Sequence, residues 1–494
     1  MIERIKQLVR HSAIYSINSA AEKAVGVIIL PLMTHYFPPG QYGNWDLLDT
    51  SITILAEVLL IGFGAVIILF NNQKEFPYEK KSSFFTLSLF LVLVAIIFTG
   101  IVEIFLQYNI APIHIRPEIV SIIKICSYIT VVRLFNNFFF GKLRADERPV
   151  YYTITNSVKL FIRTGLIIYF IKFTEHGWEG AFYSALIAEG IIFMSFAPVA
   201  FRNMKIKLNI GALKASLAIG APLMLGSIGF NILNLSDRYV IKLLIGEDPL
   251  GIYAVGYRVA GILNMFLVLP YILTLLPATF KVYKQPDDKR YFSKLMTYSA
   301  FFFVWGFVAL SLFSKEIVRI LGQQQSYHIA YIVVPLIALG YVFSGMRMTA
   351  SLGMMLTKNT KHIASTTLIS AALNIILNFI FIPIYGIMAA AVNTLLAYML
   401  FYFLTLYKSS QYYKINYETK KLAVLIATGS VLGSVIYFFP DTSLAVTIII
   451  KLLIIISFPF ILYLFHFYEK AELNILSNKE KLFDFIKGIF TKQR

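Results

Sequence analysis

The chain has 494 residues, of which 58% are hydrophobic and only 14% charged, with a formal net charge of +18. So little charge excludes a soluble globular protein of this length, and the recurring apolar runs of about 20 residues are long enough to cross a bilayer. A single cysteine, Cys126, excludes a disulfide framework, and the seven histidines are scattered without metal-ligand spacing. The sequence therefore predicts an all-α, polytopic membrane protein without a metal site or cofactor.

About fourteen membrane spans are predicted in chain order. They cover residues 13–37, 43–70, 83–107, 118–140, 150–171, 177–201, 213–245, 250–280, 294–313, 327–356, 362–384, 386–407, 420–439 and 444–467. Lys and Arg outside these spans fall mainly in alternate connecting segments, beginning with the N-terminal tail. Because positive charge marks the cytoplasmic side, both termini are predicted to be cytoplasmic. This placement of charge also argues for membrane topology and against nucleic-acid binding.

The chain contains an internal repeat. Three glycines of the first half, Gly43, Gly141 and Gly177, match three of the second half, and the matches are separated by 208, 212 and 209 positions. The glycines of the second half are Gly251, Gly353 and Gly386. Six spans separate equivalent points, so the halves share one orientation, as in transporters with parallel repeats. The predicted organisation is a six-helix lobe over 1–208, a second over 209–411, two additional helices over 412–468 and a basic amphipathic cytoplasmic tail over 469–494.

Two apolar helices meet at a tight turn near Pro383–Gly386, too short to carry a soluble domain, so these helices are predicted to be antiparallel neighbours. Asn374 and Asn378 lie one helical turn apart on the first helix. The second helix opens on Gly386 and a run of alanines, small residues that allow close helix packing in a bilayer.

Together these motifs resemble signatures of the polysaccharide flippases in the multidrug/oligosaccharidyl-lipid/polysaccharide exporter superfamily. The motifs are Asn374–Asn378, Ile382–Gly386, Ala389–Ala391 with Thr394, Ser236–Tyr239, Gly251–Arg258 and Pro39–Gly43. One departure is Met388, because the family commonly has a second glycine before the alanines. The resemblance covers nearly the whole chain.

The resemblance implies a V-shaped, MATE-like pair of lobes in a bacterial cytoplasmic membrane. The implied activity is ion-coupled movement of an undecaprenyl-pyrophosphate-linked oligosaccharide, such as an O-antigen, capsule or exopolysaccharide unit, to the outer leaflet by alternating access. Such a protein is a transporter and not an enzyme. A polysaccharide polymerase and a chain-length regulator are candidate partners.

Cations inside the spans are the candidate substrate contacts. Lys159 and Arg163 are four residues apart on one helical face, with Asn156 beside them. A pyrophosphate between the two cations would relieve their repulsion, and an ion pair with an acid on another span is the alternative. Arg133 and Lys23 are expected to complete this basic surface. Arg258 and Arg347 are the cations expected to line the cavity from the second half.

Carboxylates at membrane depth are the candidates for coupling to a proton or Na⁺. Glu57 lies deep in the second span, and Glu22 and Glu189 lie in the first and sixth spans. Salt bridges to nearby cations are the alternative for each. Asp46 and Asp49, at the outer end of the second span, are expected to be solvated.

Asp237 and Arg238, adjacent in the seventh span, are predicted to form either an outer gate pair or a structural pair.

Two other functions fit a polytopic chain. An organic-cation antiporter of the same superfamily would need a cavity rich in carboxylates and aromatics, whereas these spans hold more Lys and Arg than Asp and Glu. A membrane polysaccharide polymerase or glycosyltransferase would need a substantial outward loop with catalytic groups, and the predicted outward loops are short.

Overall fold

The computed structural model describes residues 26–27, 29–69, 77–108, 117–174, 176–357, 359, 361–439, 443–469 and 473, and these form helices and connections without a strand. The predicted Lys23 and Glu22 sites and most of the C-terminal tail lie outside the described residues. The helices of the first half are α2 (Pro39–Leu59), α3 (Phe63–Leu69), α4 (Lys80–Gln107), α5 (Pro117–Ala145), α6 (Pro149–Phe173), η1 (Gly177–Glu179), α7 (Gly180–Ser195) and α8 (Ala197–Asn203).

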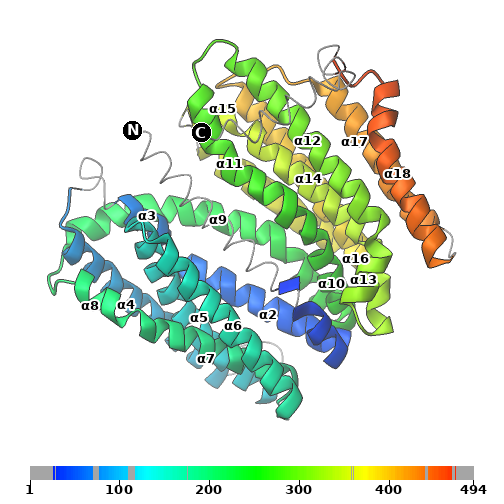
Figure 1. Ribbon diagram of the computed structural model, residues 1–494. Helices are drawn as coiled ribbons and strands as arrows, with labels where there is room; N and C mark the ends of the chain where they lie inside the picture. Colours follow the sequence, from blue (N-terminus) through cyan, green and yellow to red (C-terminus); the bar gives the residue numbers. More distant parts are fainter. Residues whose placement is uncertain are drawn as a thin grey trace.

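The second half continues the all-helical pattern (Figure 1). Its elements are α9 (Ile210–Ile245), α10 (Glu247–Leu263), η2 (Asn264–Val268), α11 (Leu269–Val282), α12 (Asp288–Leu312), α13 (Ser314–Leu321), η3 (Gln325–Ile332), α14 (Val334–Ala350), α15 (Leu352–Leu356), α16 (Lys361–Ser410), α17 (Thr419–Ser434), η4 (Val435–Phe438) and α18 (Leu444–Leu464).

The described residues contain ten helices that are long and apolar enough to span a membrane. Two bent pairs, α2 with α3 (43°) and η3 with the helix over 334–356 (47°), raise this number to twelve if each pair is one span. The 50-residue α16 corresponds to two predicted spans, because Gly386 interrupts it with non-helical backbone. Most of the first predicted span falls outside the described residues, so the count of fourteen stays a prediction.

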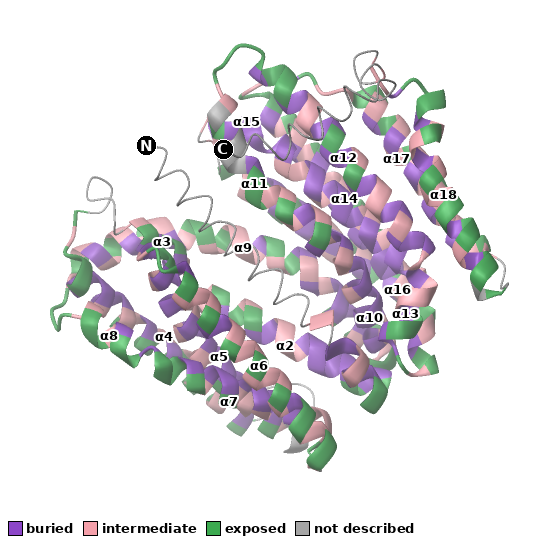
Figure 2. Cartoon of the chain, in the orientation of Figure 1, coloured by how far each residue is buried: buried purple, intermediate pink, exposed green. Residues whose placement is uncertain are grey.

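Large apolar side chains on the outside of the helices mark the surface that faces lipid. On α4, Ile96, Ile97 and Ile101 are each about 60% exposed. Figure 2 shows buried residues concentrated where helices face one another and exposed residues along the outer faces. Apolar side chains on these exposed faces are the reverse of what a soluble bundle presents to water, and they are expected for helices surrounded by hydrocarbon.

The first and second halves of the chain meet where α2 packs against α10 (Figure 1). A Cβ atom added to Gly43 would lie 2.6 Å from the backbone nitrogen of Gly251, and one added to Gly251 would lie 1.8 Å from the carbonyl oxygen of Pro39. Only glycine permits this approach. One pair of glycines that defined the repeat therefore forms a direct backbone contact between the two halves.

A second pair of glycines from the repeat interrupts the helical backbone in the same way in each half. Gly177 has φ +53° before α7, and Gly386 has φ +62° within α16. Asn393 on the second half of α16 donates to Asn378 on the first (3.0 Å), so the two halves of α16 pack side by side. The predicted hairpin of antiparallel helices is therefore confirmed, with the left-handed backbone at glycine as its physical cause.

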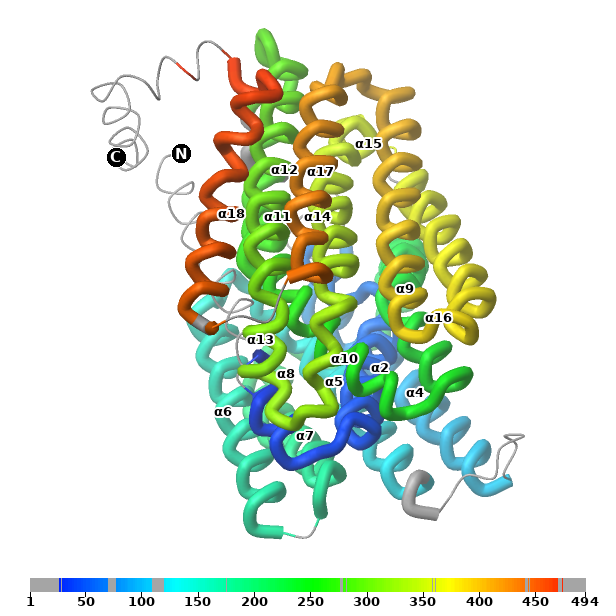
Figure 3. The backbone as a smooth tube through the Cα atoms, turned by 90° about the vertical axis from the view of Figure 1, so that its right-hand side faces the viewer, coloured from blue at the N-terminus to red at the C-terminus, as the bar shows by residue number. Residues whose placement is uncertain are grey.

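The last two helices lie along the outside of the second half, against α12 (Figure 3). Trp305 of α12 donates to the carbonyl oxygen of Ile455 (3.0 Å). Lys451, fully buried on α18, pairs with Glu316 of α13 (2.7 Å). α18 is thus fixed by a hydrogen bond and an ion pair in addition to apolar packing.

Candidate functional site

A cavity of about 620 Å³ opens between helices of the first half and α9. Its walls come from α2, α3, α5, α6, α7 and α9. It is lined by Thr53, Glu57, Leu60, Gly62, Gly64, Ala65, Arg133, Asn137, Phe140, Arg144, Tyr152, Asn156, Lys159, Leu160, Arg163, Glu189, Leu223, Met224 and Ser227. Six predicted site residues of the first half therefore share one cavity, namely Glu57, Arg133, Asn156, Lys159, Arg163 and Glu189.

Helical spacing explains why these side chains converge. On α6, Asn156, Lys159 and Arg163 follow one another at three and four residues. On α5, Arg133, Asn137, Phe140 and Arg144 occupy one face at the same spacing. The two basic faces are presented to the same space.

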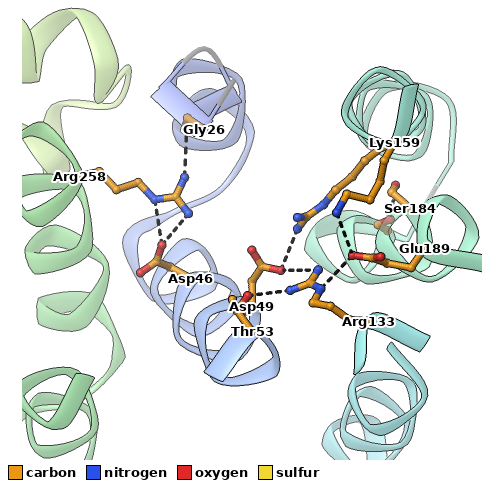
Figure 4. Close-up of polar contacts among 11 residues, drawn as sticks. Gly26, Asp46, Asp49, Thr53, Arg133, Lys159, Ser184, Glu189 and Arg258 are labelled. Carbon is orange, nitrogen blue, oxygen red and sulfur yellow. Dashed lines mark hydrogen bonds and ion pairs between the residues drawn. The ribbon is translucent and has the colours of Figure 1, made fainter. Parts of the chain in front are cut away.

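Two carboxylates organise the cations (Figure 4). Asp49 of α2 accepts a hydrogen bond from Arg163 (2.8 Å), and its oxygen lies 3.7 Å from a guanidinium nitrogen of Arg133. Glu189 of α7 accepts from Arg133 (2.9 Å) and lies 3.9 Å from the amine of Lys159. The ion pairs with acids on other helices, which the sequence analysis gave as the alternative to a bound pyrophosphate, are therefore present.

Neighbouring polar groups hold this network in place. Arg133 also donates to the hydroxyl of Thr53 (2.7 Å), and Asn136 donates to Glu189 (2.7 Å). Arg133 and Glu189 are both less than 10% exposed. Two hydrogen-bond donors, Arg133 and Asn136, and the nearby amine of Lys159 fix the Glu189 carboxylate, so its geometry is set before any ligand arrives.

Cations outnumber carboxylates in the cavity. Four lining residues are basic and two, Glu57 and Glu189, are acidic, and counting Asp49 still leaves an excess of one positive charge. Arg144 has no ion pair within the part of the chain that the structure describes. Such an excess inside membrane-spanning helices favours an anionic ligand, because unpaired charge at this depth is costly.

Asp46 links the two halves outside the cavity (Figure 4). It accepts two hydrogen bonds from Arg258 of α10 (2.9 and 2.7 Å) and lies 3.1 Å from Arg238 of α9. Asp46 is 2% exposed, so the expectation that it is solvated was wrong: it is buried where α2 packs against α9 and α10, whose arginines bind it. Arg258 does not line the cavity, because this carboxylate binds it.

Asp237 and Arg238 do not pair through their side chains, which corrects that prediction. Adjacent helical residues point in different directions, and Arg238 reaches across to Asp46. Asp237 is fully buried and accepts hydrogen bonds from the backbone of Arg238 (2.8 Å), from Tyr253 (2.5 Å) and from Thr394 (3.3 Å).

Arg347 is also absent from the cavity. Its guanidinium lies 4.4 Å from the ring centroid of Phe401 and contacts the sulfur of Met348. The sequence indicated that Arg347 lies within a membrane span. The direction of its side chain depends on the helices packed around α14, which the sequence does not identify. Conversely, Arg144 was missed because it lay in a predicted connecting segment, although its spacing from Arg133 and Asn137 on α5 would have indicated it.

Comparison with known proteins places this chain in a family. The sequence profile of the family described as "Polysaccharide biosynthesis protein" matches residues 8–283. The "Probable low-salt glycan biosynthesis flippase Agl15" of Haloferax volcanii is 24% identical over 248 residues, covering 49% of this chain and 51% of the relative. The alignment thus spans about half the length of that relative.

Solved structures show the same fold. The lipid II flippase MurJ in an inward closed conformation superposes with a TM-score of 0.72 at 17% identity, covering 91% of this chain and 98% of that one. A MATE protein in complex with MaL6 gives a TM-score of 0.61 at 14% identity, covering 85% and 96%. The profile match covers more than half of the chain, so this chain belongs to the polysaccharide biosynthesis protein family and has the fold shared by MurJ and MATE transporters.

Proposed function

We propose that this chain is a flippase that moves an undecaprenyl-pyrophosphate-linked oligosaccharide from the cytoplasmic to the outer leaflet by alternating access. The observation that carries the proposal is the excess of cations over carboxylates in a cavity among membrane-spanning helices. A pyrophosphate is a ligand of matching charge, and Arg and Lys recognise it by bidentate and point-charge contacts respectively. Family membership and the printed name of the Haloferax volcanii relative support the same activity.

The network suggests how the head group is bound. Arg163 and Lys159 are each held by a carboxylate on another helix, at 2.8 and 3.9 Å. An entering pyrophosphate competes with Asp49 and Glu189 for these cations, and Arg144 offers it a first contact. With the predicted topology, the connection between α5 and α6 is cytoplasmic, so Arg144 lies at the cytoplasmic end of the cavity and Lys159 and Arg163 lie deeper.

The contact between α2 and α10 closes the opposite end. Asp46 bonded to Arg258 and Arg238, together with Gly43 against Gly251, joins the halves where the predicted topology places the outer surface. The structure then corresponds to an inward-facing state. Outward opening requires these pairs to separate, and a proton or Na⁺ gradient, acting through Glu57, Glu189 or Asp237, is the proposed driving force.

The test is complementation of cells that lack this protein with Lys159→Gln/Arg163→Gln. Charged hydrogen bonds contribute about 1.5–3 kcal/mol each, so we expect transport to fall about tenfold or more, with lipid-linked oligosaccharide accumulating inside and surface glycan lost. The matched control is Lys124→Gln/Lys205→Gln, which removes two cations from exposed surface pairs and should complement fully. If the knockout keeps its surface glycan and becomes sensitive to cationic drugs, the antiporter function replaces this one.

A further inference from the structure

An apolar groove of about 460 Å³ lies on the membrane-spanning helices beside the cavity. α9 supplies most of its lining, and α2 and α16 supply the rest. It is lined by Ile54, Val58, Ile228, Asn231, Ile232, Leu235, Ser236, Tyr239, Val240, Leu243, Ile375 and Phe379. Each helix contributes residues three or four positions apart, so the groove is a continuous face of packed helices.

The groove and the cavity are contiguous along the seam between α2 and α9. On α9, Met224 and Ser227 line the cavity, and Ile228 and Asn231, in the next turn, line the groove. On α2, Glu57 lines the cavity and its neighbour Val58 lines the groove. One site is thus cationic and the other apolar, with only the seam between them.

The seam is weakly held at this point. Towards one end Ser51 hydrogen-bonds to Tyr239 (2.7 Å), and towards the other the backbone at Gly62 packs closely on Gly220. Between these points, the seam places Glu57 of α2 near Asn231 of α9, whose amide nitrogen is buried without a hydrogen-bond partner among the described residues. Separating α2 from α9 at this point therefore breaks few polar contacts.

We propose that this groove binds the polyprenyl chain of the lipid-linked substrate while its charged head group occupies the cavity. The proposal rests on the flippase function proposed above. The linkage between chain and head group then passes the seam at Glu57 and Asn231. An apolar chain suits the lining because burying apolar surface against side chains gives a bound lipid close van der Waals contacts, and the adjacent cations select a lipid with a pyrophosphate.

A second apolar groove provides a matched control. It measures about 610 Å³ and lies on α10, η2, α12 and α13, which contribute no residue to the cavity. Phe266 is exposed on it, as Ile232 is on the first groove. Both grooves are apolar and accessible to lipid, but only the first continues into the cation-lined cavity.

The test is photo-crosslinking of the full chain in vesicles of phosphatidylethanolamine and phosphatidylglycerol that contain undecaprenyl pyrophosphate. Benzoylphenylalanine replaces Ile232 or, as the control, Phe266, and mass spectrometry identifies the captured lipid. We expect Ile232 to capture undecaprenyl pyrophosphate about tenfold above its mole fraction, and Phe266 to capture lipids in proportion to the mixture. Adding Lys159→Gln/Arg163→Gln should remove the preference at Ile232, because the cavity anchors the head group.

Capture at Ile232 in proportion to the mixture would overturn the proposal, since the groove would hold ordinary bilayer lipid. Crosslinking to another protein copy, or a preference that survives the cavity variant, would overturn it too. The outcome is separable from that of the proposed function: transport without selective capture refutes the groove alone, whereas selective capture without transport refutes the flippase activity alone.

Discussion

Glu189 in the first half and Asp237 in the second are both buried carboxylates on membrane-spanning helices, but their partners differ in kind. Glu189 is held by the cation Arg133 and the amide of Asn136 beside an open cavity. Asp237 is held by a backbone amide and by the hydroxyls of Tyr253 and Thr394, away from that cavity. The same helical pattern thus supports an ion-pair network in one half and a largely neutral hydrogen-bond network in the other.

The second-half network extends through α16. Ser236 donates to Asn374 (2.7 Å), Asn378 donates to Asn374 (3.0 Å), and Asn393 donates to Asn378 (3.0 Å). All three asparagines are buried. Neutral side chains of this kind tie α9 to both halves of α16 and offer no excess charge. Under the proposed function, we therefore expect a charged head group to bind in the first half.

The largest expected effect on stability comes from Glu189→Gln. This substitution leaves the buried Arg133 with its hydrogen bond to Thr53 and, as its remaining ion pair, the 3.7 Å contact to Asp49, and breaking a buried ion pair costs about 3–5 kcal/mol. We expect a lower midpoint of thermal unfolding in detergent and reduced abundance in the membrane. Arg133→Gln/Glu189→Gln should recover part of the loss; a double variant that is as unstable as the sum of the single variants would show that the pair is not coupled.

A smaller effect on stability is expected from Asp237→Asn. The amide keeps one oxygen acceptor but presents two hydrogens to donors, which costs about 1–3 kcal/mol for an unsatisfied buried group. If Asp237 is the coupling carboxylate, the stimulation of transport by a proton or Na⁺ gradient should disappear while gradient-free transport persists. The comparison variant is Glu57→Gln, which should retain the stimulation. The reverse result would assign coupling to the cavity in the first half.

The smallest effect is expected from Arg347→Met. Arg347 packs on Phe401 and has no acidic partner in the described part of the chain, so a side chain of similar volume should change the unfolding free energy by less than about 1.5 kcal/mol. Transport should remain near the wild-type rate in the complementation assay. A loss comparable to that of Lys159→Gln/Arg163→Gln would show that cations of both halves bind the head group, and the contrast between the halves would fail.

Several features could be predicted from the sequence because they depend on local pattern. Hydropathy and span length predict an all-helical membrane fold, since the bilayer admits only helices or closed barrels. Spacing alone places Lys159 beside Arg163, and glycine with apolar flanks predicts the breaks that Gly177 and Gly386 make. The motifs also led to the family that the profile match shows.

Tertiary structure decided which charges meet. Asp46 and Asp49 lie three residues apart on α2, yet one binds Arg258 of the other half and the other binds Arg163 of its own half. Periodicity gives the direction of a side chain on its own helix but not the identity of the helix that faces it. Arg258, Arg347 and Arg144 were therefore misplaced or missed, because the partner of a buried charge is set by the packing of helices far apart in the chain.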